Sequence, residues 1–178
     1  ISAKNLTLNN TTINNQGGQL LASENLTASA ETLNNQGGTL AASQTASITG
    51  TTVNNQAGLI QGHKTTIDAA SLDNSNTLDA GGIIAEQALS IQLTQTLNNQ
   101  SGNIAGDSVE ANVANIDNRQ GAIQANDALK LTVTKHLNNS AGTIASAGEV
   151  NLSSATLTNA QKGYIASKTE VGIQAGSI

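Results

Sequence analysis

The stretch Leu33-Asn34-Asn35-Gln36-Gly37-Gly38-Thr39-Leu40 decides the fold of this chain, because versions of it recur along the whole sequence. Each version has an apolar anchor and an asparagine two residues later. The anchors are spaced by 20, 20, 19, 25, 19, 21 and 20 residues. A nearly constant period of this size indicates a solenoid, in which each repeat forms one coil. The eight anchors are Ile13, Leu33, Val53, Leu72, Leu97, Ile116, Leu137 and Leu157.

The composition favours a structure that is ordered but thin. Of the 178 residues, 37% are hydrophobic and Tyr164 is the sole aromatic residue, so a compact globular core is not expected. Only 11% of the residues are charged, which argues against a disordered chain. Proline is absent, and because proline lacks the N–H that a strand ladder needs, every coil can hydrogen-bond its neighbours.

The asparagine two residues after the anchor is present in all eight copies. Equivalent residues of stacked coils lie about 4.8 Å apart, so these side chains can pass amide hydrogen bonds from coil to coil as a ladder. Asparagine also tolerates the left-handed backbone of a tight corner. The predicted ladder consists of Asn15, Asn35, Asn55, Asn74, Asn99, Asn118, Asn139 and Asn159.

A glycine follows the asparagine at the same corner in seven of the copies. It lies five residues after the anchor, or six in the last copy, and we expect it to supply a positive φ at no steric cost. The predicted corner glycines are Gly18, Gly38, Gly58, Gly102, Gly121, Gly142 and Gly163.

Two strands are expected in each coil. The first is the short apolar run after the glycine, and the second alternates apolar and polar residues before the next anchor, as at Leu129, Leu131 and Val133. All copies run in the same sense, which excludes hairpins, and crossovers prefer a right-handed path. The prediction is an all-β chain that forms a right-handed parallel β-helix of eight to nine coils over residues 1–178, with a length of roughly 40 Å.

One interval, from Leu72 to Leu97, is longer than the others. The extra residues follow Asn74, so we expect a corner insertion near residues 75–81. Solenoid loops absorb added length at low cost, and a tolerated surface insertion is one interpretation. The other is a recognition loop, which would consist of Ser75, Asn76, Thr77, Leu78 and Asp79.

No catalytic, metal-binding or cofactor-binding residues are predicted. His63 and His136 have no companion ligands at metal-site spacing, and the sequence has no calcium-binding nonapeptide or phosphate-binding loop. Asp73 and Asp117 share a repeat position, but at roughly 10 Å apart they are too loosely placed for a catalytic pair. We expect Asp117 to form a local ion pair with Arg119.

The charge pattern also argues against a nucleic acid partner. The net charge of -5 is spread over twelve acidic and seven basic residues without a basic patch, so no nucleic acid partner is expected. The sequence shows no signal peptide and no stretch that could span a bilayer, and Ile1 leads almost directly into a repeat. We interpret the chain as a single segment of a longer filament.

The phrase from Leu33 to Gly38, with the apolar run after it, resembles the repeats of filamentous haemagglutinin and related exoproteins of two-partner secretion. The resemblance covers essentially the whole chain. Similar repeats occur in contact-dependent growth inhibition exoproteins, in which a β-helical filament presents a receptor-binding region and a C-terminal toxin. The resemblance implies a secreted Gram-negative surface filament with a shaft that lacks catalytic residues. Asp73, Asp117 and Thr158 depart from the repeat and put the regularity of their corners in doubt.

We therefore expect a structural shaft that projects distal adhesin or toxin regions toward a target cell. Its expected partners are an outer-membrane transporter during export and, through other regions, a target-cell receptor or glycan. The alternative is that this segment is itself an adhesin. A polysaccharide-acting enzyme is a remote alternative, because such sites need clustered carboxylates and aromatic platforms. Unpaired strand edges at the ends also predict end-to-end self-association of the fragment.

Overall fold

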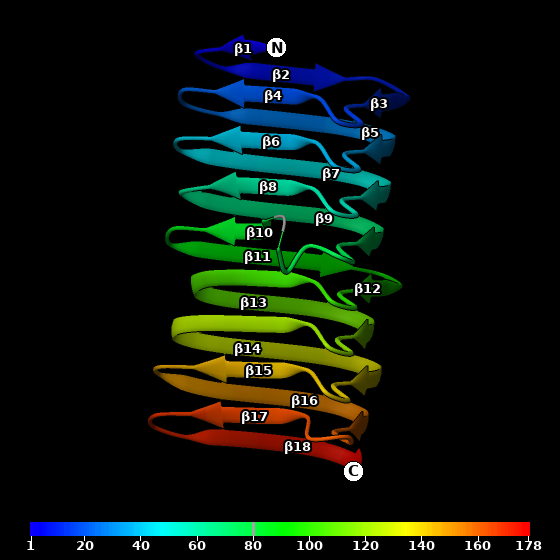
Figure 1. Ribbon diagram of the computed structural model, residues 1–178, viewed down its shortest axis with the longest axis vertical. Coiled ribbons are helices and arrows are strands. Elements are labelled where there is room, and N and C mark those ends of the chain that lie inside the picture. Colours follow the sequence, from blue (N-terminus) through cyan, green and yellow to red (C-terminus); the bar gives the residue numbers. More distant parts are fainter. Residues whose placement is uncertain (80) are drawn as a thin grey trace.

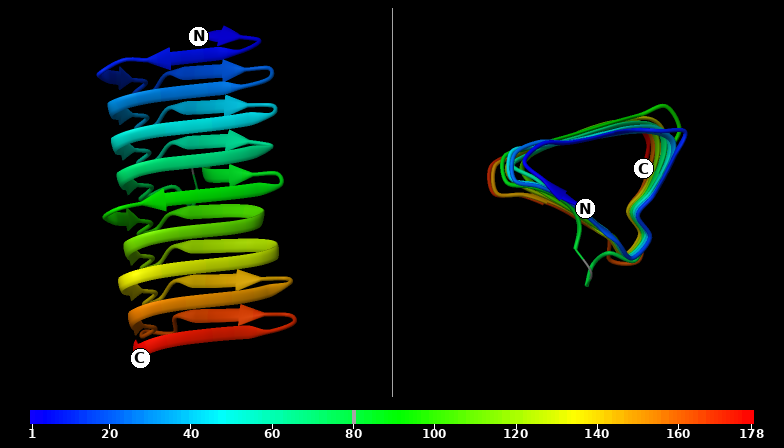
Figure 2. Two further views of the ribbon diagram at one scale, coloured as in Figure 1. Left: turned by 180° about the vertical axis from the view of Figure 1, so that it is seen from behind. Right: turned by 90° about the horizontal axis from the view of Figure 1, so that it is seen from above.

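The structure is a computed structural model, and it describes residues 1–79 and 81–178. Every regular element in these residues is a strand, and the strands wind around one axis into a rod of about nine coils, with roughly 20 residues in each (Figure 1). The two termini lie at opposite ends of the rod. Seen from the N-terminal end, the chain turns clockwise as it recedes, so the winding is right-handed (Figure 2). The predicted parallel β-helix is confirmed.

The coil has a triangular cross-section (Figure 2), and its three sides are parallel sheets, which we call faces A, B and C. Face A follows the asparagine corner. It consists of β1 (Ser2–Ala3), β4 (Gln19–Ala22), β6 (Thr39–Ala42), β8 (Leu59–Gly62), β10 (Gly82–Ala85), β15 (Thr143–Ser146), β17 (Tyr164–Ser167) and the first four residues of β13 (Asn103–Asp117) and β14 (Ala122–Asn138).

Faces B and C are largely built by the same long strands. Face B contains β2 (Leu6–Asn9), β11 (Ala88–Leu93), β18 (Val171–Ser177), the middle of β13 and β14, and the first part of β5 (Leu26–Asn34), β7 (Thr45–Asn54), β9 (Lys64–Asp73) and β16 (Glu149–Thr158). Face C contains β3 (Thr12–Asn14), β12 (Thr96–Asn98) and the last three residues of β5, β7, β9, β13, β14 and β16.

The third face corrects our expectation of two strands per coil. A long strand bends from face B to face C without a turn, at a place where at least two consecutive residues are not buried. In β5 these are Glu31 and Thr32, between buried Ala30 and buried Leu33. Neither glycine nor proline lies at this bend in β5, so the only sign of it in the sequence is the break in the alternation of apolar and polar residues between Ala30 and Leu33.

The core is a set of aliphatic columns that run along the rod axis. The eight anchors pair in register on face C, from Ile13 with Leu33 through to Leu137 with Leu157. Leu33, Val53 and Leu97 are 0% exposed. Burial of each such side chain contributes about 1.5–3 kcal/mol, and the in-register pairing fixes the asparagine corner that follows each anchor.

Candidate functional site: the asparagine corner and its insertion

The inner asparagines form a continuous hydrogen-bonded ladder inside the rod. The Nδ2 of each one donates to the Oδ1 of the next along the chain, over distances of 2.7–2.8 Å from Asn15 to Asn159. Asn35 shows the remaining contacts, because its Nδ2 also reaches the carbonyl oxygens of Gly38 at 3.2 Å and Leu59 at 3.1 Å. Asn35 is 0% exposed. The buried amide is therefore fully satisfied, which removes the cost of its desolvation.

The corner glycines are required for a different structural reason from the positive φ that we expected. Positive φ belongs to the residue just before the glycine, such as Gly37 at 61° or Ala57 at 53°, and not to Gly38. A Cβ on Gly38 would lie 2.7 Å from Asn35 Oδ1 and closer still to the carbonyl oxygen of Asn15. The prediction of positive φ is wrong at all seven corner glycines, Gly18, Gly38, Gly58, Gly102, Gly121, Gly142 and Gly163. They are needed because the asparagine ladder leaves no room for a side chain.

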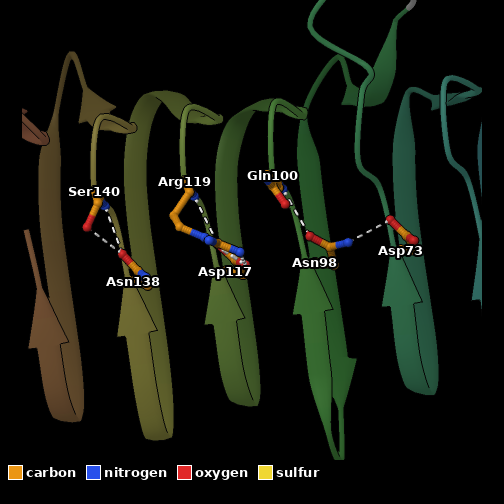
Figure 3. Close-up of polar contacts among 7 residues, drawn as sticks. All are labelled: Asp73, Asn98, Gln100, Asp117, Arg119, Asn138 and Ser140. Carbon is orange, nitrogen blue, oxygen red and sulfur yellow. Dashed lines mark hydrogen bonds and ion pairs between the residues drawn. The ribbon is translucent and has the colours of Figure 1, made fainter. Parts of the chain in front are cut away.

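A second polar column, which we call the outer column, consists of the residue just after the anchor in the first seven copies, and Figure 3 shows four of its members. Its side-chain oxygen accepts the backbone N–H two residues later, as Asn98 does from Gln100 at 3.2 Å and Asn138 does from Ser140 at 3.0 Å. This bond closes the corner as an Asx turn. Our sequence reasoning missed this role, although the recurrence of Asn or Asp at this position is visible in seven of the eight copies.

The two aspartates in this outer column form the same Asx turn as the asparagines. Asp73 Oδ1 accepts the Ser75 N–H at 2.9 Å and also the Asn98 Nδ2 at 3.1 Å (Figure 3). Asp117 Oδ1 accepts the Arg119 N–H at 3.2 Å. A carboxylate accepts as an amide oxygen does, so the departures from asparagine do not disturb these corners. Asn98 lies in the coil between the two aspartates, and the structure does not bring their carboxylates together.

Asp117 also forms the predicted ion pair with Arg119, which is confirmed. The Arg119 Nη2 lies 2.6 Å from Asp117 Oδ2, and Nε donates to Oδ1 at 2.9 Å. The hydrogen bonds from the Arg119 side chain hold the pKa of the Asp117 carboxyl below its ordinary value, although partial burial opposes them. The pair lies at the surface, where such pairs contribute little.

The insertion begins later than we expected. Ser75 and Asn76 keep regular corner positions. The Ser75 carbonyl oxygen accepts the Ala57 N–H at 3.0 Å, and the Asn76 N–H donates to the Gln100 carbonyl oxygen at 3.0 Å. Thr77 is 0% exposed, and its hydroxyl accepts the Asn103 N–H at 2.9 Å while it donates to the Asn74 carbonyl oxygen at 3.0 Å. Of the predicted recognition loop, Ser75, Asn76 and Thr77 are therefore part of the rod.

The residues added to this coil follow Thr77 and precede β10. Leu78 and Asp79 are exposed, Leu78 by 46%, and Gly81 has a φ of 131°. Ala80, which our predicted insertion included, lies outside the described residues. In the right-hand view of Figure 2, the segment that joins β9 to β10 departs from the triangular outline that the other coils share.

The described residues hold no group of three or more side chains that could bind a metal ion. His63 Nδ1 lies 3.1 Å from Glu86 Oε2, and His136 contacts the Thr156 hydroxyl. Within the same residues, no helix has the length and apolar character needed to cross a membrane.

Comparison with protein-family models identifies the haemagglutinin repeat in three overlapping stretches, residues 1–84, 66–141 and 124–178. Together they cover the whole chain. No curated protein and no solved structure matches the chain.

Proposed function

The chain belongs to the haemagglutinin repeat family, and on that premise we propose that it is a structural shaft of a large secreted bacterial exoprotein. Haemagglutinin repeats are typical of secreted or surface-exposed bacterial proteins. The shaft is exported through an outer-membrane two-partner secretion transporter and projects distal adhesin or toxin regions toward a target cell.

The observation that carries this proposal is the unbroken inner ladder. It crosses even the irregular corner, where Asn55 donates to Asn74 and Asn74 donates to Asn99, both at 2.8 Å. Parallel pairing on all three faces joins the same coils. A rod tied in this way at every coil resists bending, and a rigid rod transmits position from one end to the other.

The test is to change the outward side chains of the segment within the full-length exoprotein. Lysine replacements at Thr27, Ser90 and Thr132 on face B alter the surface and leave the core untouched, since these side chains point outward. We expect binding and toxicity toward target cells to be retained. Loss of target binding, with normal secretion and a normal circular dichroism spectrum, would show that the segment itself carries recognition.

A second candidate function, adhesion by the segment itself, is favoured by one observation, the exposure of Leu78 and Asp79 beyond the rod surface. Deletion of residues 78–81 tests it and preserves Thr77, which the corner needs. The shaft proposal expects unchanged adhesion of the purified segment and of the exoprotein, whereas the adhesin proposal expects adhesion to disappear. A catalytic role is not part of either proposal, and it would require polysaccharide degradation that Asp73→Asn or Asp117→Asn abolishes.

A further inference from the structure

Face A differs from the other two faces in its surface chemistry, because none of its strand residues is charged. Face B presents charged side chains such as Asp68, Glu110 and Lys130, and face C presents Asp73 and Asp117. The central outward column of face A consists of small or uncharged residues in continuous register: Leu21, Ala41, Gln61, Ile84, Ala105, Gln124, Ala145 and Ala166.

A flat face of this kind fits a second copy of itself. Its columns repeat at the strand spacing of about 4.8 Å, and stacked sheets with the same spacing pack about 10 Å apart. Nine strands of about four residues cover roughly 500 Å² in projection, or roughly 1,000 Å² for two copies, which is near the lower limit for a specific interface. The net charge lies on other surfaces, so repulsion across this face is weak.

The insertion lies halfway along the rod, at the edge of this face next to the asparagine corner. It enters β10, the fifth of the nine strands in face A, and turns onto the outward Leu59 of β8, since a Cβ on Gly81 would lie 3.0 Å from Leu59 Cδ1. From the other side, Asn103 Nδ2 donates to the Gly81 carbonyl oxygen at 2.9 Å. The segment between β9 and β10 projects outward on the face A side in Figure 2. It also carries Asp79, an exposed carboxylate.

We propose that this insertion, held between Leu59 and Asn103, prevents face A from packing against face A of a second copy of the chain. A projection halfway along the edge of this face holds the two sheets apart along their length, because each rod is rigid. Natural proteins protect exposed sheet edges against association with comparable devices, and the insertion would do the same for a sheet face. The insertion then serves to keep neighbouring shafts separate, and this role does not depend on whether the segment binds a receptor.

The experiment is deletion of residues 78–81, which joins Thr77 to Gly82 and restores a corner of ordinary length. Sedimentation velocity over a range of concentrations gives the association of the parent chain, which serves as the baseline. The deletion variant should associate at least about tenfold more tightly. Ala105→Lys in the deletion variant places a charge on face A and should abolish the added association, whereas the matched Asn112→Lys on face B should not.

Two outcomes would overturn the proposal. One is a deletion variant that has the parent circular dichroism spectrum and the parent association behaviour. The other is association that survives Ala105→Lys, which would identify end-to-end contact between coils. If the deletion variant fails to fold, Asn103→Ala provides the second test, because it releases the insertion and leaves the strand in place. That variant should associate more than the parent, and Gln61→Lys should reverse the effect.

Discussion

Most asparagine corners of the rod combine a buried asparagine with a glycine, whose missing side chain leaves room for the ladder. The asparagine column could be predicted from the sequence, because a residue that recurs once per coil must meet its own copies in a stack. The role of the glycine could not, because the atom nearest to a Cβ on Gly38 belongs to Asn15, one coil away. The sequence shows glycine at both Gly37 and Gly38, and only the stacking separates their roles.

The inner ladder predicts unequal effects of asparagine substitutions. Asn99→Ala should lower the free energy of unfolding by about 3 kcal/mol, because it leaves Asn118 Oδ1 without its donor and Asn74 Nδ2 without its acceptor, both inside the rod. Asn103→Ala, which loses one bond to Gly81, should cost about 1 kcal/mol. Asn112→Ala on face B is the control. Urea unfolding measures all three, and equal losses would contradict a stabilising ladder.

The two adjacent glycines provide a matched pair. Gly38→Ala should destabilise by about 3 kcal/mol, because the added Cβ collides with Asn35 and Asn15. Gly37→Ala should cost only about 1 kcal/mol, since its φ is 61° but no atom lies within 4 Å of the added Cβ. Ala57 already occupies the equivalent position in the next coil. A reversed order of melting temperatures would refute the close-approach explanation.

The Asp117–Arg119 pair predicts a specific dependence of stability on pH. The pKa of Asp117 is lower in the folded chain than in the unfolded chain, so the pair stabilises the fold above the unfolded-state pKa. This contribution is lost as the pH falls through the folded-state pKa. Below about pH 4, Asp117→Asn and Arg119→Gln should each lose less melting temperature on acidification than the parent. If all three proteins lose the same melting temperature on acidification, the ion pair does not contribute to the stability of the fold.

At the scale of elements, the strands and their order could be predicted better than the path between them. Apolar periodicity identifies the strands, but the bend at Glu31 and Thr32 carries no turn residue, and the third face therefore went unpredicted. The length of the insertion was visible as a spacing, yet its boundary was not. Thr77 occupies a corner position through its hydroxyl, and a threonine hydroxyl as a substitute for a backbone acceptor has no sequence signature.

Thr77 should be needed for the irregular corner. Thr77→Val keeps the shape but removes the acceptor of the Asn103 N–H and the donor to the Asn74 carbonyl oxygen, both in or near the core. We expect a loss of about 2 kcal/mol in unfolding free energy. Thr77→Ser retains the hydroxyl and should recover most of this loss. Hydrogen exchange at Asn103 should be faster in the valine variant alone, and equal exchange in both would exclude the hydroxyl as the acceptor.

The whole molecule is a one-dimensional stack, in which each coil contacts only its two neighbours. Faces, ladder and outer column all repeat with the coil, so the coil is the unit that the fold can gain or lose. Residues 34–53 form one such unit, from just after the anchor Leu33 to the next anchor, Val53, and they contain no charged residue. Their removal therefore tests length and register without a change in net charge.

Deletion of residues 34–53 should leave a folded rod that is shorter by about 5 Å. It joins Leu33 to Asn54, so Asn15 meets Asn55 and the anchor column closes without a gap. Deletion of residues 44–53 is the matched control, because it also removes no charge but leaves half a coil, and the following strands lose their pairing register. Small-angle scattering should give the shorter rod for the first variant, with a cooperative melt near that of the parent. The second should lose cooperativity, and a half-coil deletion that melts as well as the full-coil deletion would show that register does not hold the stack together.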